Sequence, residues 1–412
     1  MMLPNGWKKV RLSELGTFSK GSGIKRDEAN SGSIPAIRYG EIYTAHNDYI
    51  KQFQSFISEN VAKEATLLKN GDLLFSCSGE TKEDIGKCVA FVSNERAYAG
   101  GDIIILSPTV PCDSKYIGFL CNSSFVNKQR YSFAQGDSIV HISSESIGKI
   151  EIPFPPLNEQ KKIAATLSVW DSAIEKMEKL IEAKSEQKKT LTYKLIENQN
   201  DVKFKLGDVT IDKSKWKKKS LKEMGSFSKG QGIKRDDALS GNIAAVRYGE
   251  IYTTHNDYIK EFHSFISEDV AKKSKLLKKG DLLFSCSGET KEDIGKCVAF
   301  VSDIVAYAGG DIIIFSPQIE CDSKYLGFLL NSPSISKQKY GLGQGDSIVH
   351  ISAESIGRLT VFLPSYPEQK VIADVLSAID DELALLKQQL ENYKKQKQGL
   401  MQKLLTGQWR VK

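Results

Sequence analysis

The sequence repeats itself with an offset of 209 residues, and no insertion or deletion interrupts the match between residues 7–195 and 216–404. The segments Gly71–Ser93 and Gly280–Ser302 are identical over 23 positions. Solenoid repeats are much shorter, with periods of about 20–50 residues. An offset of this length therefore indicates a duplicated domain together with the element that follows it in each copy.

The first part of each copy predicts a globular domain of mixed α+β class. Short apolar runs such as Asp72–Phe75 and Asp102–Leu106 have the length and composition of strands. The segment Ser58–Leu68 predicts a helix. Prolines at positions 153, 155 and 156, and again at 364 and 367, end the two globular parts, because proline disfavours helix in the residue before it.

The second part of each copy predicts a long amphipathic helix with a heptad repeat. Apolar residues alternate at spacings of four and three over more than four heptads, which is typical of a coiled coil. Lys184 and Lys188 lie in the first seam, Lys397 interrupts the second, and Gly407 stands where a helix-ending glycine belongs. The predicted seam residues are Ile163, Leu167, Trp170, Ile174, Met177, Ile181, Leu191 and Leu195 in the first copy, and Ile372, Leu376, Ile379, Leu383, Leu386, Leu390, Tyr393, Leu400 and Leu404 in the second.

Each apolar seam needs a partner, and the simplest partner is the other seam. About 40 residues of helix make a rod of roughly 60 Å. We expect the two helices to pair antiparallel under a pseudo-twofold axis, with one domain at each end. Parallel pairing would need a long return path through Asn198–Lys215, and a separate helical hairpin or a homodimer seam is an open alternative. The expected divisions are domain 1 (1–156), spacer helix 1 (157–198), domain 2 (199–365) and spacer helix 2 (366–412).

Composition excludes some classes of protein and leaves others open. No apolar run reaches the roughly 20 residues that span a bilayer, and no signal peptide begins the chain, so we expect a cytoplasmic protein. The seven cysteines form no Cys-x-x-Cys pair, which favours free, buried thiols. Lys and Arg balance Asp and Glu at 17 each in residues 1–156 but exceed them by 24 to 21 in residues 199–365. This balance permits nucleic-acid binding without requiring it.

Several motifs resemble those of type I restriction–modification specificity subunits. They are the segments Ile34–Ile42, Gly71–Ser76, Gly86–Ala90, Ile152–Ile163 and the final Lys403–Gly407. The resemblance covers the whole chain in the family's order of recognition domain, spacer helix, recognition domain and spacer helix. The second copy departs from the pattern at Phe362–Gln369, which lacks the first proline, so the turn there is in question.

The resemblance implies a subunit without a catalytic site that reads double-stranded DNA. Each recognition domain would read one half of a bipartite site in the major groove, and the helices would set the gap between the halves. Expected partners are methyltransferase subunits, two in number, on the outer helix faces, and restriction subunits with motor activity. S-adenosylmethionine, ATP and Mg²⁺ are expected in those partners, with no cofactor or metal in this chain.

Four polar, glycine-containing loops in each copy carry side chains suited to DNA contact. They begin at Lys20, Arg38, Ser78 and Gln135 in the first copy. Arg38 has an open alternative role in a structural ion pair. The predicted DNA-contacting residues are Lys20, Lys25, Arg26, Arg38, Tyr39, His46, Asn47, Lys82, Gln135 and Asp137, with their counterparts Lys229, Lys234, Arg235, Arg247, Tyr248, His255, Asn256, Lys291, Gln344 and Asp346.

Near-identical domains should read near-identical half-sites, so we expect an interrupted palindrome as the target. The nearest enzyme alternative is a metal-dependent nuclease that uses Asp72, Glu80 and Lys82, although their spacing is short. A methyltransferase is disfavoured because Phe154–Leu157 has the two prolines without the polar residue that holds the target amine. A non-catalytic coiled-coil scaffold is the other alternative.

Overall fold

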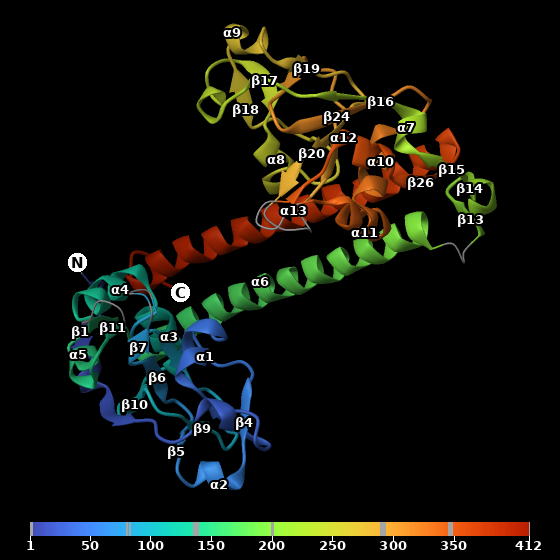
Figure 1. Ribbon diagram of the computed structural model, residues 1–412. Coiled ribbons are helices and arrows are strands. Elements are labelled where there is room, and N and C mark those ends of the chain that lie inside the picture. The colour runs from blue at the N-terminus through green and yellow to red at the C-terminus, as the bar shows by residue number, and fades with distance from the viewer. Residues whose placement is uncertain are drawn as a thin grey trace. The chain divides into compact units, whose positions relative to one another are not determined.

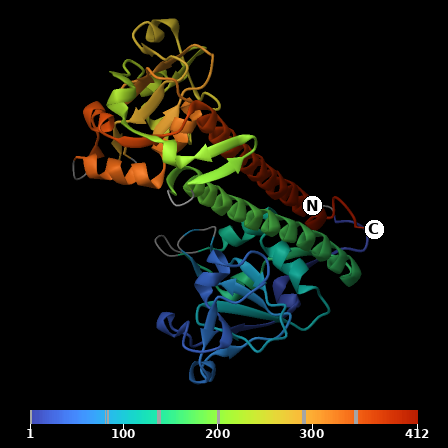
Figure 2. The same cartoon turned by 90° about the vertical axis from the view of Figure 1, so that its right-hand side faces the viewer.

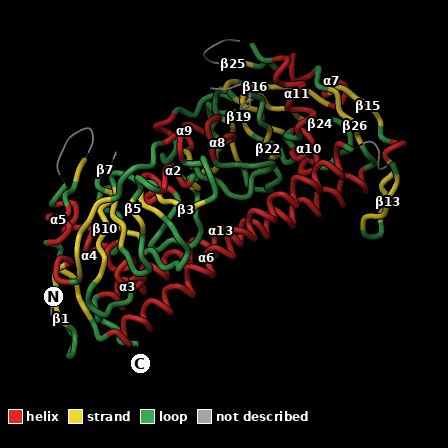
Figure 3. Tube along the Cα trace, turned by 90° about the horizontal axis from the view of Figure 1, so that it is seen from below, coloured by secondary structure: helices red, strands yellow, loops and turns green. Residues whose placement is uncertain are grey.

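The computed structural model describes residues 3–79, 81, 84–134, 140–198, 202–288, 294–344 and 349–411. The chain forms two compact units. Unit 1 consists of Met1–Lys179 and Gln388–Lys412, and unit 2 of Leu180–Lys387. Helix α6 (Leu157–Thr192) and helix α13 (Tyr366–Leu405) are each continuous, so each contributes residues to both units (Figures 1 and 3).

Domain 1, in unit 1, is built on a four-stranded antiparallel sheet. Its order is β2 (Gly16–Lys20), β10 (Ile103–Pro108), β6 (Leu73–Ser76) and β8 (Cys88–Ala90). Strands β6 and β8 are buried along their whole length, because the sheet is covered on both faces. The apolar runs that predicted strands are therefore β6 and β10.

A second sheet of four strands has the order β4 (Ser55–Ile57), β3 (Ile34–Ile37), β9 (Tyr98–Ala99) and β5 (Thr66–Leu67), with β3 and β9 parallel. The predicted helix over Ser58–Leu68 is wrong for most of its length. Only α2 (Glu59–Ala62) is helical, because Thr66 and Leu67 pair instead with β9.

Two short strand pairs and several helices complete domain 1. Strand β1 (Lys8–Arg11) pairs with β12 (Glu151–Phe154), and β7 (Ser78–Gly79) pairs with β11 (Val140–His141). The helices are α1 (Tyr39–Thr44), α3 (Ser114–Cys121), α4 (Ser124–Ser132) and α5 (Ser144–Gly148), with 3-10 turns at Leu12–Glu14 and Arg26–Glu28. The largest core cluster of unit 1 also includes Ile163 and Leu167 of α6 and Leu404 of α13, so both long helices are part of this core.

Domain 2, in unit 2, repeats this architecture at the same offset. The turn that lacks the first proline keeps its form, since α13 starts at Tyr366 as α6 starts at Leu157. The strands are β15 (Lys217–Ser220), β16 (Gly225–Lys229), β17 (Ile243–Val246), β18 (Ser264–Ile266), β19 (Lys275–Leu276), β20 (Leu282–Ser285), β21 (Ser287–Gly288), β22 (Cys297–Ala299), β23 (Ala306–Ala308), β24 (Ile312–Pro317), β25 (Val349–His350) and β26 (Thr360–Leu363). The helices are α7 (Leu221–Met224), α8 (Tyr248–Thr253), α9 (Glu268–Ala271), α10 (Ser323–Leu330), α11 (Pro333–Leu342) and α12 (Ala353–Gly357), with 3-10 turns at Lys213–Lys215 and Arg235–Asp237.

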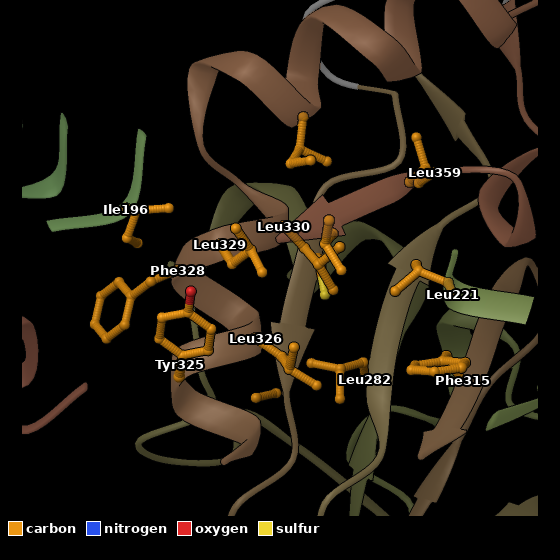
Figure 4. Close-up of a cluster of buried hydrophobic side chains, with 14 of the residues drawn as sticks. Ile196, Leu221, Leu282, Phe315, Tyr325, Leu326, Phe328, Leu329, Leu330 and Leu359 are labelled. Atoms are coloured by element: carbon orange, nitrogen blue, oxygen red, sulfur yellow. The ribbon is translucent and has the colours of Figure 1, made fainter. Parts of the chain in front are cut away.

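The core of unit 2 joins α10 to the sheet and to the end of α6. Figure 4 shows Tyr325, Leu326 and Leu329 of α10 between the strand residue Leu282 and Ile196, which lies in the π-helical turn Tyr193–Glu197 after α6. One element has no counterpart among the described residues of unit 1. The hairpin of β13 (Lys203–Leu206) and β14 (Val209–Asp212) precedes domain 2 and turns at Gly207, whose φ is +59° (Figure 2).

The helices α6 and α13 pair antiparallel within each unit, as predicted. In unit 1, Asp171 lies 2.6 Å from Lys397, and Glu178 lies 3.0 Å from Lys394. In unit 2, Lys184 lies 2.9 Å from Glu382, and Lys188 lies 2.7 Å from Asp380. In both cases residue numbers rise along one helix and fall along the other.

Every predicted seam residue is buried or half-buried. The fully buried ones are Ile163, Leu167, Leu195, Ile372, Leu376, Leu383 and Leu404. Trp170 and Tyr393 meet edge to face, with ring centroids 6.0 Å apart. Gly407 ends α13 with φ at +74°, as expected of a helix-ending glycine. Within the described part of the chain, no helix combines the length and apolar character needed to cross a bilayer.

Candidate nucleic-acid interface

Three of the four predicted DNA-contacting loops are joined at one edge of the domain 1 sheet. Strands β2 and β6 both pair antiparallel with β10, so they run in the same direction and end together. Lys20 at the end of β2 pairs with Ile104, and Ser76 at the end of β6 pairs with Ile103. The short pair β7–β11 then brings the start of the third loop against the segment that follows the fourth.

The second loop lies at the same edge. The amide of Gly100 donates to the carbonyl of Ile37, directly before Arg38, at 2.9 Å. The amide of Gly21 in the first loop donates to the carbonyl of Ile103, the first residue of β10, at 2.9 Å. In domain 2, the Tyr248 hydroxyl of the second loop lies 3.4 Å from the carbonyl of Ser287 in the third. We call this surface the loop edge: residues 20–27, 38–47, 76–79, 81 and 140–141 in domain 1, and the described residues at the same offset in domain 2.

The first loop presents its cations to solvent. Lys20, Lys25 and Arg26 are exposed, as are their counterparts Lys229, Lys234 and Arg235. Its glycines have a structural reason. A Cβ on Gly21 would clash with the carbonyl oxygen of Gly100, and the same clash links Gly230 to Gly309. The glycines are therefore required by chain packing, whether or not a phosphate approaches them.

Arg38 takes part in the structural ion pair that was the alternative to DNA contact. Its Nε donates to Glu41 at 3.0 Å and to the Ser55 hydroxyl at 3.0 Å, and the Ser55 hydroxyl also donates to Glu41. Glu41 is buried while Arg38 keeps 33% of its side chain exposed. Arg247 forms the same network with Glu250 and Ser264. This network holds the N-terminus of α1, and of α8, against the sheet.

The remaining residues of the second loop divide into exposed and buried ones. Tyr39 is 37% exposed, and Asn47 and Asn256 are exposed. Tyr248 is half-buried. His46 and His255 are only 5% exposed, and burial lowers the pKa of both imidazoles. The interpretation of these two histidines as base-contacting residues needs correction, because their rings lie in the interior.

Some predicted residues cannot be placed. Lys82, Gln135 and Asp137, and their counterparts Lys291 and Asp346, lie outside the described residues. Gln344 is described and exposed, and its backbone pairs with His350.

Sequence reasoning missed two groups of residues near the loop edge. Lys87 donates to the carbonyl of His46 at 2.6 Å, and Lys296 does the same to His255. Lys397 of α13 lies 2.6 Å from Asp171 and 3.2 Å from Asp48, whose carboxylate also accepts from Asn122. Burial opposes the charge of Lys397, but the two carboxylates outweigh it and raise its pKa.

Lys188 forms the same arrangement in unit 2, where it bridges Asp380 and Asp257 at 2.7 and 3.2 Å. We call Lys397, Asp48 and Asp171, and Lys188, Asp257 and Asp380, the two lysine triads. A signal for them was present in the sequence, because a lysine interrupts both apolar seams at equivalent positions.

The described residues of the loop edge carry groups suited to binding nucleic acid. No group of three or more His, Cys, Asp and Glu side chains among them could hold a metal ion. Asp72, which the nuclease alternative requires, is 3% exposed and accepts from Ser107 and from the backbone of Lys69. Exposed cations and amides on loops at a sheet edge suit contact with phosphates and base edges.

Comparison with known families decides the assignment. The model of the type I restriction modification DNA specificity domain matches residues 4–185 and again residues 213–394, which are separated by the same offset as the repeat. The chain belongs to this family. It is a DNA specificity subunit of a type I restriction–modification system, with two target-recognition domains.

Relatives of the specificity subunit extend over its whole length. The MjaVIII specificity subunit of Methanocaldococcus jannaschii is 24% identical over 431 residues, covering 100% of this chain and 95% of the relative. The EcoKI specificity subunit of Escherichia coli is 28% identical over 173 residues, covering 40% of this chain and 36% of the relative. The crystal structure of the S subunit from M. genitalium has the same fold, with a TM-score of 0.62, 18% identity and 98% coverage of both chains.

Proposed function

We propose that this specificity subunit reads a bipartite DNA target through the loop edges of its two domains. The two half-sites would be inverted, nearly identical and separated by unread base pairs. The observation that carries this proposal is the near-identity of the two loop edges, including the 23 identical residues that contain the third loop. Domains with the same fold and the same contact residues select the same bases.

The inverted orientation is supported by the helices. Two equivalent helices that pair antiparallel are interchanged by a twofold rotation, and α6 and α13 run antiparallel within each unit. That rotation would carry one loop edge onto the other. DNA strands are related by the same kind of axis, so the target would be an interrupted palindrome.

Different residues of the loop edge would have different roles. Lys20, Lys25 and Arg26 would bind phosphates and position the domain, since contacts to phosphates fix the orientation of a protein on DNA and carry no sequence information. Tyr39 and Asn47 would reach base edges, together with Lys82, Gln135 and Asp137. Amides and cations at such positions discriminate bases through the donor and acceptor pattern of the major groove.

Catalysis would be carried out by partners. We infer that the chain supplies no catalytic group, and that two methyltransferase subunits and motor-containing restriction subunits assemble with it and hold S-adenosylmethionine, ATP and Mg²⁺. Apolar side chains on the solvent side of the long helices support a protein partner there. Val169, Leu180 and Leu385 are 68%, 43% and 54% exposed.

Methylome sequencing of a strain that expresses the subunit with its methyltransferase tests the proposal. The expected result is one methylated motif made of two inverted, near-identical half-sites with a fixed gap. A strain that carries the methyltransferase alone is the control. Unrelated half-sites would reject the inverted arrangement, and a complex that fails to retard DNA in a gel shift would favour the scaffold alternative.

A further inference from the structure

A basic groove in unit 2 is lined by residues of domain 2 and of the two long helices. It has a volume of about 820 Å³ and is lined by residues of α6, α8, α11 and α13. Asn256 of the domain 2 loop edge also lines it, so the groove opens beside the surface that we propose to read DNA. Its charged lining consists of six lysines and three carboxylates: Lys188, Lys189, Lys260, Lys296, Lys339, Lys387, Glu197, Asp257 and Asp380.

The matching positions of unit 1 carry less positive charge, which makes unit 1 an internal comparison. Lys387 corresponds to Glu178, Ala384 to Glu175, and Lys189 to Gln398. In the opposite direction, Ser185 corresponds to Lys394. Through all the equivalences, five cations face four carboxylates at the unit 1 positions, against six and three in the groove of unit 2. The larger positive charge of unit 2 therefore arises from a few substitutions on the helices and not from the shared fold of the domains.

Two of the lysines are already neutralised within the protein. Lys188 belongs to a lysine triad, and Lys260 lies 2.6 Å from Asp381. Lys339 differs from them. It is 2% exposed, and its ammonium donates to the carbonyl oxygen of Gly295 at 2.8 Å, a neutral acceptor. Burial and the nearby charge of Lys296 lower the pKa of Lys339 to about 8, which an anion in the groove would reverse.

Glu197, one of the three carboxylates that line the groove, is bound there by a backbone amide. The carboxylate of Glu197 accepts from the backbone amide of Ser334 in the first turn of α11 at 2.7 Å. In unit 1 the position of Glu197 is taken by Thr406. The first turn of α11 thus faces the groove with its donors and accepts negative charge there, as the N-terminus of a helix favours.

We propose that this groove binds backbone phosphates of DNA that runs past the loop edge of domain 2, so that unit 2 holds DNA beyond its half-site with more positive charge than unit 1. This inference rests on the proposed function. A phosphodiester fits the site because it brings one delocalised charge per nucleotide to lysines whose geometry tolerates a range of oxygen positions. Exposed Lys387 and Lys189 lie at the rim, and Lys296 and Lys339 lie deeper.

The test exchanges groove residues for their unit 1 counterparts in the subunit assembled with its methyltransferase. The variants are Lys387→Glu alone and Lys387→Glu with Ala384→Glu. Both positions are exposed on α13, so the fold should be retained. Affinity for a duplex that contains the full target is measured between low and moderate salt. We expect the single variant to lose about fivefold in affinity, and the slope of log affinity against log salt to fall by about one for each lost phosphate contact.

The reciprocal substitution Glu178→Lys in unit 1 is the matched control, and it should raise affinity and steepen the salt slope. A duplex that ends at the outer edge of the half-site lacks the flanking phosphates and keeps those of the spacer. If Lys387→Glu also weakens binding to this shorter duplex, the groove binds spacer phosphates. If it weakens binding to the longer duplex alone, the groove binds flanking phosphates. An unchanged affinity and slope in both Lys387 variants would overturn the groove proposal. Loss of the methyltransferase from the complex would assign the groove to a protein partner and overturn it too.

The two proposals can fail separately. If a strain with the Lys387→Glu subunit still methylates the same bipartite motif, and the purified variant complex binds DNA with an unchanged dependence on salt, the groove proposal fails and the proposed function stands. If the unmodified subunit directs no bipartite methylation, the proposed function itself fails.

Discussion

The ammonium of Lys397 lies 2.6 Å from the carboxylate of Asp171, across the interface between the two long helices in unit 1. The lysine is 13% exposed and the aspartate 7%, so this ion pair is buried among apolar seam residues. A single buried polar position in a coiled coil fixes the register of its helices, because any other alignment leaves the charge without its partner. Since Asp48 of domain 1 joins the pair, the same contact also fixes the domain on the helices.

Replacing the lysine of a triad should destabilise the unit that contains it. We expect Lys397→Met to lower the free energy of unfolding by about 3 kcal/mol, because two carboxylates are left buried without their cation. Urea unfolding followed by tryptophan fluorescence measures the change. Lys395→Met, at an exposed position on the same helix, is the control and should have little effect. Equal stability of the two variants would show that the triad does not hold the unit together.

Lys339 should make the stability of unit 2 depend on alkaline pH. Its pKa in the folded chain is lowered to about 8 by burial, below the value of about 10.4 in an unfolded chain. Between these values the unfolded state binds more protons, so this contribution to stability rises with pH from about 8 to 10. The destabilisation caused by burying the charged ammonium of Lys339 is fully present below pH 8 and amounts to about 3 kcal/mol.

Unfolding curves at a series of pH values check this dependence. Lys339→Arg copies the residue of domain 1, Arg130, and keeps its charge over the whole range, so the pH-dependent gain should disappear in that variant. A gain of the same size in both proteins would place its origin elsewhere.

Arg38→Ala should lower the stability of the folded protein, and this effect should exceed the effect of losing one positive charge on DNA binding. The variant leaves buried Glu41 without its cation and removes the hydrogen bond that Arg38 donates to the Ser55 hydroxyl, and we expect a loss of about 2 kcal/mol in stability. Arg38→Lys should recover only part of the loss, since a lysine cannot reproduce the planar donor geometry. Thermal unfolding is the measurement, and an unaltered melting temperature for Arg38→Ala would contradict the structural role.

The cations of the first loop should behave in the opposite way. We expect the double variant Lys25→Ala with Arg26→Ala to keep its stability within about 0.5 kcal/mol, because both side chains are exposed. Its affinity for target DNA in the assembled complex should fall, with the salt slope reduced by about two. Lys8→Ala, exposed on β1 and away from the loop edge, should leave both unchanged. A double variant with full affinity would remove these residues from the interface.

The parts of this fold that follow from sequence are those set by periodicity and duplication. The heptad spacing from Ile372 to Leu404 predicts α13 because a helical seam leaves its mark in one continuous segment. The failed helix at Ser58–Leu68 has another cause. Ser58 caps a true helical turn, but Thr66 and Leu67 pair with β9, more than 30 residues away in sequence, and this non-local pairing has no local signal.

The candidate site shows the same division. Exposed Lys25 and Arg26 follow from a charged loop between strands, since few folds bury two such side chains. The burial of His46 depends on the packing of α1 against the sheet, which has no local signal in the sequence. The ion pair between Arg38 and Glu41 does have a local signal, because the two residues are three positions apart. The role of Lys397 depends on three segments, since its partners are Asp171 of α6 and Asp48, which lies between α1 and β4.

The two lysine triads exchange their cations between the repeats. Lys397 comes from the second copy but neutralises Asp48 and Asp171 of the first, while Lys188 comes from the first and neutralises Asp257 and Asp380 of the second. A polypeptide severed between the copies would therefore leave each fragment with carboxylates that only a complementary fragment, or another molecule of the same fragment, can satisfy. Folding of either fragment is thus coupled to its association with a second fragment.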